Sequence, residues 1–249
     1  MKYIVTLLLL LCSLQLQAIE PQKPTILAFG DSNTWGWKSV AESEGSNGKF
    51  ADHERWTGVM EQALGGNYKV VVSGLVGRTT DLDGRNVGAI SAESFNGAGA
   101  LPMAIARHNP LALVVIMLGT NDLQSGYNKT PREIARSAFS LARTVKGMNN
   151  ALYSHYPAPQ VLLITPAPLG DTSKTPLKSL FQSGEAPSKQ LSAAFTAESL
   201  ADENQDIWLM DAGKITTTDG ADGIHLSQKN HKLLGMAIAK YIKSKSTAL

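Results

Sequence analysis

The sequence predicts an α/β fold, in which one domain is built on a five-stranded parallel sheet with helices on both faces. Short apolar runs of strand length alternate with segments that fit amphipathic helices. Residues 111–118 are apolar at every position, and strands of this kind are covered on both faces, as in parallel sheets. A chain of 249 residues suffices for one such domain with a full core and is short for two.

The expected elements follow one another in regular alternation. The candidate strands are residues 25–29, 68–72, 111–118, 160–165 and 206–210. The candidate helices are residues 56–64, 98–107, 131–148 and 189–200, with a final amphipathic segment at 227–245. No internal repeat with a period of 20–50 residues is present, so a solenoid or propeller is not expected.

One helix start is specified by its own sequence. Thr130, Pro131 and Glu133 have the order of an N-cap, a proline in the first turn and the glutamate of a capping box. This pattern satisfies backbone donors that would otherwise lack partners at the helix start. We therefore expect the helix at 131–148 to begin at Pro131.

Residues 1–18 have the pattern of a secretory signal peptide. Lys2 precedes an apolar block at 4–11, a more polar stretch at 13–17 and the small residue Ala18. The block is far shorter than the roughly 20 residues that span a bilayer, so we expect cleavage and no retained membrane anchor. The expected product is a domain at 19–249 that is periplasmic or secreted.

Charge and cysteine content exclude several classes. The chain has 23 basic and 21 acidic residues, and loss of Lys2 with the leader would lower the net charge from +2 to +1. This balance gives no indication of a nucleic-acid partner. The single cysteine, Cys12, lies in the leader, so a mature chain would have neither a disulfide nor a catalytic thiol.

Polar motifs follow four of the expected strands. They are Ser32, the glycine-containing turn at 74–80, residues 119–122 and the loop at 222–225. The carboxyl ends of parallel strands lie at one edge of a sheet, where ligands bind. Taken singly, each motif has a simpler explanation as a helix cap or a turn. Their shared position at strand ends instead favours an active site.

The residue types at this edge suit acyl transfer. A serine hydroxyl needs a base to take its proton, and His225 is a candidate base with Asp222 as its orienting carboxylate. Candidate donors to an oxyanion are the Ser32 N–H, an N–H in the glycine turn and the side-chain amide of Asn121. The other four histidines show no metal-ligand spacing, and we expect no metal or cofactor.

These four motifs resemble, in order, the four sequence blocks of the SGNH (GDSL-type) hydrolases, named after their Ser, Gly, Asn and His. The resemblance implies that Ser32 is the nucleophile, that Asp222 and His225 complete the triad, and that Ser32, Gly77 and Asn121 donate to the oxyanion. Gly77 is preferred to Gly74 because the donor of the family precedes an x-Thr pair.

The chain most resembles the bacterial arylesterase and acyltransferase branch of this family. The matching segments are residues 30–37, 55–59, 77–80, 117–122, 156–159 and 218–225. The branch implies a flavodoxin-like three-layer α/β/α sandwich, small acyl esters as substrates and, in some members, acyl transfer to alcohols. Homo-oligomers are common in it.

The chain departs from the family pattern beside the nucleophile. Asn33 replaces the leucine of the GDSL motif, and Ser73 stands where many members have asparagine. Side chains that we expect to contact substrate are Asn33, Trp37, Thr120, Leu177 and Phe181.

Three functions remain open at this point. The leading hypothesis is a serine esterase that hydrolyses small aryl or alkyl esters through an acyl-enzyme at Ser32. The alternative is a carbohydrate O-acetyl esterase, although no appended sugar-binding module is present. A non-catalytic binding protein on the same scaffold belongs to a different class, since fold does not fix function.

Overall fold

A computed structural model describes residues 23–39, 48–149, 155–173, 175–202, 206–218 and 222–245. The leader expected at 1–18 lies outside the described residues. The strands are β1 (Thr25–Gly30), β2 (Lys69–Gly74), β3 (Leu113–Met117), β4 (Gln160–Thr165) and β5 (Ile207–Asp211). They form one sheet in the order β2-β1-β3-β4-β5, and every pair is parallel. The five-stranded parallel sheet is therefore confirmed.

Strand boundaries differ slightly from the expected ones. β3 begins at Leu113 rather than at residue 111. Ala112 still contacts both neighbouring segments, because its N–H donates to the Thr25 carbonyl and its own carbonyl accepts from the Gln160 N–H. The apolar run therefore extends the pairing beyond the regular strand.

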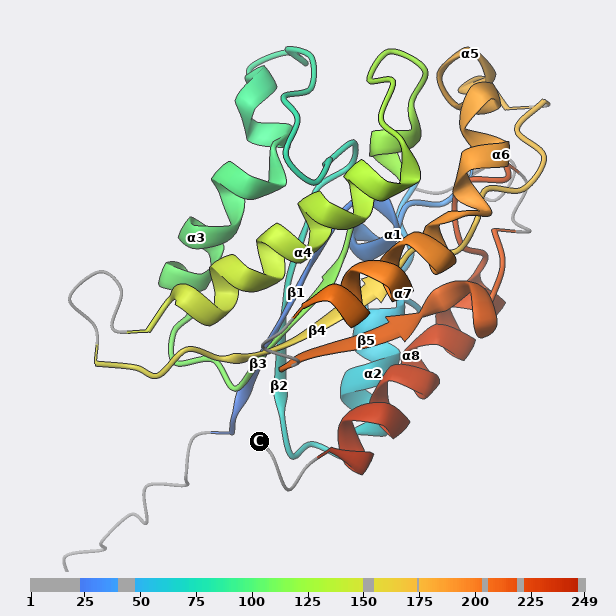
Figure 1. Ribbon diagram of the computed structural model, residues 1–249. Helices are drawn as coiled ribbons and strands as arrows, with labels where there is room; N and C mark the ends of the chain where they lie inside the picture. Colours follow the sequence, from blue (N-terminus) through green and yellow to red (C-terminus); the bar gives the residue numbers. More distant parts are fainter. Residues whose placement is uncertain are drawn as a thin grey trace, which may run out of the picture.

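Helices cover both faces of the sheet (Figure 1). On one face lie α2 (Trp56–Ala63) and α8 (Gln228–Ser244), and on the other lie α3 (Gly97–His108), α4 (Pro131–Gly147) and α7 (Leu191–Ala201). The three-layer α/β/α sandwich is thus confirmed. The segment before α7 contains the short helices α5 (Lys178–Phe181) and α6 (Glu185–Ser188).

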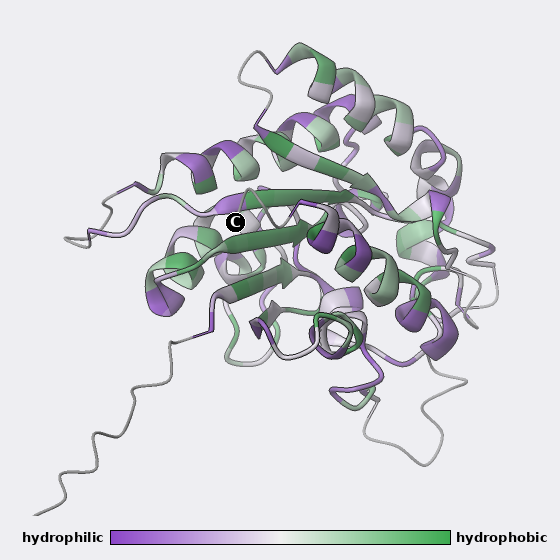
Figure 2. Ribbon diagram, turned by 90° about the horizontal axis from the view of Figure 1, so that it is seen from below, coloured by the Kyte–Doolittle hydropathy of each residue, from purple (hydrophilic) through white to green (hydrophobic). Residues whose placement is uncertain are grey.

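Each face of the sheet has its own hydrophobic core. In β1, Leu27 and Phe29 pack toward α3 and α4, while Ile26 and Ala28 pack toward α2 and α8. This division follows from the two-residue period of a strand, which points successive side chains to opposite faces. Figure 2 shows the strands as largely hydrophobic and the helices as mixed in hydropathy.

The chain order places a topological switch point at β1. The helix α2 joins β1 to β2 on one face, and α3 returns from β2 to β3 on the other, so β1 has a neighbour on each side. In open α/β sheets the carboxyl end of such a strand faces a crevice that binds ligands. The residues that directly follow Gly30 occupy this place, together with the short helix α1 (Ser32–Trp35).

The capping box of α4 is present as expected. The Thr130 hydroxyl accepts from the Glu133 N–H, and the Glu133 carboxylate accepts from the Thr130 N–H at 2.8 Å. Within the described ranges, no helix is both long and apolar enough to cross a membrane.

Candidate active site

Ser32 lies where β1 passes into α1. The carboxylate of Asp31 caps α1 by accepting from the Asn33 N–H at 2.9 Å, which orients the first turn. Gly30 is required for the tight turn, because a Cβ there would lie 2.1 Å from the Thr34 hydroxyl. The turn leaves the Ser32 side chain buried at the crevice, with 4% of the residue exposed.

A continuous chain of hydrogen bonds joins Ser32 to the loop before α8. The distance from Ser32 Oγ to His225 Nε2 is 3.0 Å, and the distance from His225 Nδ1 to Asp222 Oδ2 is 2.7 Å. The other oxygen of Asp222 accepts from the N–H groups of Ile224 and His225, both at 2.9 Å. Gly223 has φ +68° and lies against the Asp171 carbonyl, where a Cβ would approach to 2.6 Å. The three side chains expected to act together do meet.

The electrostatics of this chain keep Asp222 charged. Burial acts to raise the pKa of Asp222, but hydrogen bonds from the His225 ring and from the backbone outweigh it, so the pKa lies below its ordinary value. A charged Asp222 holds the proton of His225 on Nδ1. The free lone pair of Nε2 then faces the Ser32 hydroxyl, as general-base action requires.

Asn33 connects the nucleophile segment to the histidine loop. Its side-chain oxygen accepts from the Leu226 N–H at 2.9 Å, and its side-chain nitrogen donates to the Ile224 carbonyl at 3.3 Å. The residue is 5% exposed. Since both polar atoms bond to backbone on either side of His225, Asn33 holds the loop against α1. The structure thus gives Asn33 a structural contact, and its expected contact with substrate stays a prediction.

The expected oxyanion donors come from three strand ends. Within the described part of the chain, the N–H groups of Ser32 and Gly77 have no hydrogen-bond acceptor. Gly77 has φ +85°, a conformation that favours glycine. The side-chain nitrogen of Asn121 donates to the Arg78 carbonyl at 3.0 Å, and its oxygen accepts from Gln124 Nε2 at 3.0 Å. These bonds fix the orientation of the amide and leave one of its hydrogens for a ligand.

Arg78 anchors the glycine turn to β1. Its Nη1 donates to the carbonyls of Gly30 at 3.0 Å and Ser73 at 2.6 Å, and its guanidinium lies 4.3 Å from the centre of the Phe29 ring. Burial lowers the pKa of Arg78 to about 10, and burial raises the pKa of Asp31 to about 6. Sequence reasoning did not single out Arg78 or Asp31, although both lie inside the motifs that it identified.

The remaining expected substrate contacts have different surroundings. The Trp37 ring stacks on the His225 imidazole with centroids 5.8 Å apart, so it borders the site. Thr120 is buried at the start of the 3₁₀ turn at Asn121–Leu123. Phe181 is 3% exposed and belongs to the hydrophobic core beneath α4 and α7, against which Leu177 also packs. The structure therefore places Leu177 and Phe181 in core packing, and no described contact brings either to Ser32.

His231 is the other buried histidine close to this region. Its Nδ1 accepts from the Trp56 N–H at 3.3 Å, and its ring meets the Phe50 ring edge-on at 5.1 Å. Burial lowers its pKa to about 3, and the positive charge of Arg55 adds to the effect. Among the described residues, no cluster of His, Cys, Asp and Glu could hold a metal ion.

Comparison with known proteins decides the family. The model of the GDSL-like Lipase/Acylhydrolase family matches residues 28–233. The chain belongs to this family. It is accordingly a carboxylic ester hydrolase, and the expected SGNH relationship is confirmed. No curated protein matches the chain.

Solved structures of esterases resemble this GDSL-like hydrolase over most of its length. A carbohydrate acetylesterase from Sinorhizobium meliloti is 39% identical with a TM-score of 0.80, covering 89% of this chain and 99% of its own. The native aryl esterase of M. smegmatis is 37% identical with a TM-score of 0.80 and the same coverage. A carbohydrate acetylesterase family member from Sinorhizobium meliloti is 28% identical with a TM-score of 0.77, covering 89% and 98%.

Replacement of Asn33 by leucine should weaken both stability and turnover. Asn33→Leu fills similar volume but leaves the Leu226 N–H and the Ile224 carbonyl without partners, which costs about 1–3 kcal/mol of unfolding free energy. Turnover of p-nitrophenyl acetate should fall, since the loop carrying His225 is no longer fixed. Urea unfolding and steady-state kinetics measure the two effects. Asn86→Ala is the matched control, because Asn86 also accepts a backbone N–H but on the exposed surface. Equal effects of the two variants would contradict this role.

Buried His231 should make the protein sensitive to acid. The unfolded chain takes up a proton near the ordinary histidine pKa of about 6.5, whereas the folded protein resists it until about pH 3. The stability contributed by neutral His231 is therefore present above about pH 6.5 and is lost as the pH falls, by up to about 1.4 kcal/mol per pH unit. Urea unfolding from pH 7 to about pH 4 should show this slope reduced in His231→Gln and retained in a variant of the exposed His53, His53→Gln. Parallel curves for wild type and His231→Gln would rule out the effect.

Proposed function

We propose that the protein is a serine esterase that hydrolyses small acyl esters through an acyl-enzyme at Ser32. The observation that carries this proposal is the hydrogen-bond chain from Asp222 through His225 to Ser32, with 2.7 Å and 3.0 Å between the bonded atoms. A nucleophile, a base and an orienting carboxylate in this order are the groups that acyl transfer requires.

In the first half-reaction, His225 Nε2 takes the proton of Ser32 as Oγ attacks the ester carbonyl carbon. The carbonyl oxygen becomes an oxyanion, which the Ser32 N–H, the Gly77 N–H and the Asn121 amide stabilise. When the tetrahedral intermediate collapses, the bond to the alcohol oxygen breaks and His225 gives its proton to that oxygen. The alcohol leaves, and the acyl group remains on Ser32.

In the second half-reaction, a water molecule replaces the alcohol. As the water oxygen attacks the acyl carbon, His225 takes a proton from the water. His225 returns this proton to Ser32 Oγ when the carboxylic acid leaves. An alcohol that attacks in place of water gives a new ester, so the same groups support acyl transfer. Asp222 stays ionised throughout and stabilises the imidazolium that forms in each half-reaction.

Two substrate classes have support from the comparisons. The aryl esterase of M. smegmatis supports small aryl esters, and the carbohydrate acetylesterase from Sinorhizobium meliloti, at 39% identity, supports sugar acetates. We take small aryl and alkyl esters as the leading class. Values of kcat/KM for p-nitrophenyl esters from acetate to octanoate, beside acetylated monosaccharides, decide between them. A clear preference for sugar acetates would favour the second class.

We also propose that residues 1–18 are removed on export and that the enzyme works in the periplasm or outside the cell. The support is the charged, apolar and small-residue order of this segment. N-terminal sequencing of the exported protein should give a chain that begins at Ile19. An intact Met1 on the exported protein would contradict the proposal.

A fluorophosphonate probe tests the acyl-enzyme directly. It should label Ser32 stoichiometrically in the wild type, since His225 activates the hydroxyl, and Ser32→Ala should not be labelled. Peptide mass spectrometry locates the adduct, and circular dichroism checks that the variant is folded. Folded wild-type protein without an adduct at Ser32 would refute the proposed function.

A further inference from the structure

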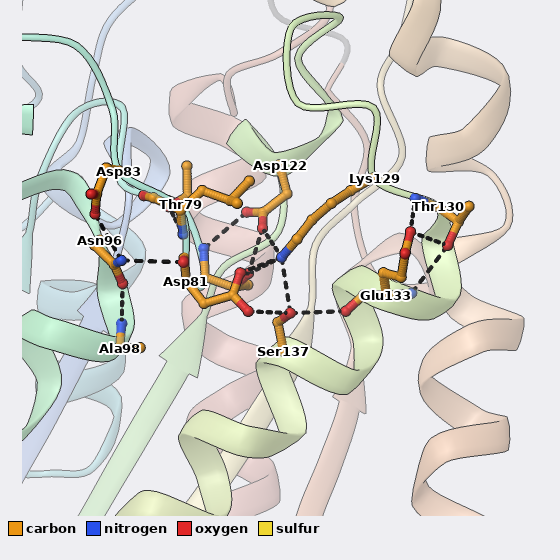
Figure 3. A network of polar contacts seen from close by, with 12 residues as sticks. Thr79, Asp81, Asp83, Asn96, Ala98, Asp122, Lys129, Thr130, Glu133 and Ser137 are labelled. Carbon is orange, nitrogen blue, oxygen red and sulfur yellow. Dashed lines mark hydrogen bonds and ion pairs between the residues drawn. The ribbon is translucent and has the colours of Figure 1, made fainter. Parts of the chain in front are cut away.

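A largely buried group of charged and hydroxyl side chains lies behind the expected oxyanion donors, and only its Asp81 side chain is substantially exposed, at 40%. It consists of Thr80, Asp81, Asp122, Lys129 and Ser137, which we call the rear cluster (Figure 3). These residues come from the turn after β2, the turn after β3, the loop before α4 and α4 itself. None of them takes part in the proton transfers described above.

Lys129 is the centre of the rear cluster. Its Nζ contacts Thr80 Oγ1 and Asp122 Oδ1, both at 3.2 Å, and Ser137 Oγ at 2.9 Å, and it forms an ion pair with Asp81. The side chain is only 12% exposed. An ammonium has three N–H donors, so these four acceptors occupy all of them. One cation thus joins the turn that carries Asp81 to the turn that carries Asp122.

Asp122 makes the second connection between the two turns. Its Oδ2 accepts from the Thr80 N–H at 3.0 Å, and its Oδ1 accepts from the Thr80 hydroxyl. The carboxylate is completely buried. Burial is the main cause that raises the pKa of Asp122, and Thr80 and Lys129 oppose that rise. The ionised form therefore depends on these two partners.

The bonds of Lys129 and Asp122 affect the oxyanion donors because the donors are close to these bonds in the sequence. Asn121 directly precedes Asp122, and Gly77 lies three residues before Thr80. Among the described residues, the Asn121 amide also joins the two turns, because it donates to the Arg78 carbonyl. Without the rear cluster, that amide would have to hold the turns together and serve the oxyanion as well.

Charge also favours a role for Lys129. Asp81 and Asp122 place two carboxylates on adjacent turns, near the place where negative charge develops during the reaction. An ammonium between them offsets one negative charge and prevents the turns from repelling each other. Ser137 supports the arrangement from α4 by donating to Asp81 Oδ2 at 2.7 Å.

We propose that Lys129 is a positioning residue for the oxyanion hole, which sets the separation of the Gly77 and Asn121 donors by joining Asp81 to Asp122. This inference rests on the proposed function, because it assumes that these donors meet the oxyanion. Lys129 itself does not touch the substrate. Its loss should weaken stabilisation of the tetrahedral state and leave binding of the ground-state ester unchanged.

The test compares Lys129→Met with the wild type in three measurements. With p-nitrophenyl acetate, kcat should fall roughly 10- to 100-fold, as expected when catalytic groups are displaced by a distance near 1 Å, while KM stays within about twofold. The affinity for phenylboronic acid, which forms a tetrahedral adduct on serine, should fall by the same factor as kcat/KM. A residue that merely stabilises the fold would lower the melting temperature without this match between the two factors.

Two further variants test whether the effect comes from the ionic link itself, rather than from a change in net charge or from poor folding. Lys129→Met combined with Asp81→Asn removes the link, but the rear cluster keeps its formal charge of −1, since one carboxylate replaces two carboxylates and an ammonium. Asp81→Asn alone changes a side chain that is 40% exposed and leaves the pair of Lys129 with Asp122 intact. The double variant and Asp81→Asn should both lose kcat and boronate affinity with little change in KM, as Lys129→Met does. The loss should be smaller in Asp81→Asn.

The matched control is Lys146→Met at the far end of α4. Lys146 Nζ also bonds to a carboxylate, Asp206 Oδ2 at 2.6 Å, and to Gln160 Oε1 at 2.9 Å, but at the opposite edge of the sheet. It should retain wild-type kcat and boronate affinity. If the rear-cluster variants do the same, the positioning role is wrong. If the wild type itself neither binds the boronate nor is labelled at Ser32, the proposed function fails instead.

Discussion

Strand β1 has a parallel neighbour on each side, and its burial between them fixes where Ser32 lies. The strand packs Leu27 and Phe29 into one core and Ile26 and Ala28 into the other, so it cannot shift by one residue without exchanging the two faces. Gly30 then marks the end of the strand in register with Gly74 of β2 and Met117 of β3. Three strand ends are thereby aligned, and the turns that follow them carry the nucleophile and the expected oxyanion donors.

The segments that surround the site contain several buried charges with specific partners. Arg78 is bound by backbone carbonyls and by the Phe29 ring, while Lys129 lies between two carboxylates. Asp222 accepts two backbone N–H groups beside the imidazole. A buried charge that lost its partner would cost several kcal/mol, so the turns are tightly constrained in relative position. The same bonds that satisfy the charges therefore hold the site in one arrangement.

Features determined by neighbouring residues were accessible from the sequence. The apolar run of β3 and the capping box at Thr130 depend on residues within a few positions, and both are found as expected. The contacts of Asn33 and Lys129 are of another kind. Asn33 bonds to residues 191 and 193 positions away, and Lys129 reaches Asp81 48 positions away. Only the fold shows which distant backbone groups need a partner, so no local pattern could reveal these roles.

For Leu177 and Phe181, the sequence suggested a role at the site, whereas the structure shows packing against the core. An apolar side chain in a segment near the site is suited equally to a substrate pocket and to a core, and the sequence does not distinguish them. The structure shows that this segment begins the short helices α5 and α6 and turns Phe181 into the core beneath α7. Burial of the Phe181 ring removes apolar surface from water, which stabilises this packing.

Helix α1 has only four residues, too few to be stable by itself. It keeps its place because contacts from elsewhere hold it: the Asp31 cap, the donation from Arg55 Nη1 to the Trp35 carbonyl at 3.1 Å, and the two bonds of Asn33. The last of these contacts end on either side of His225. Any movement of α1 that displaced Ser32 would therefore pull the histidine loop with it. The distance between nucleophile and base is preserved because both are fixed to the same side chain, whereas the oxyanion donors depend on a separate set of bonds behind them.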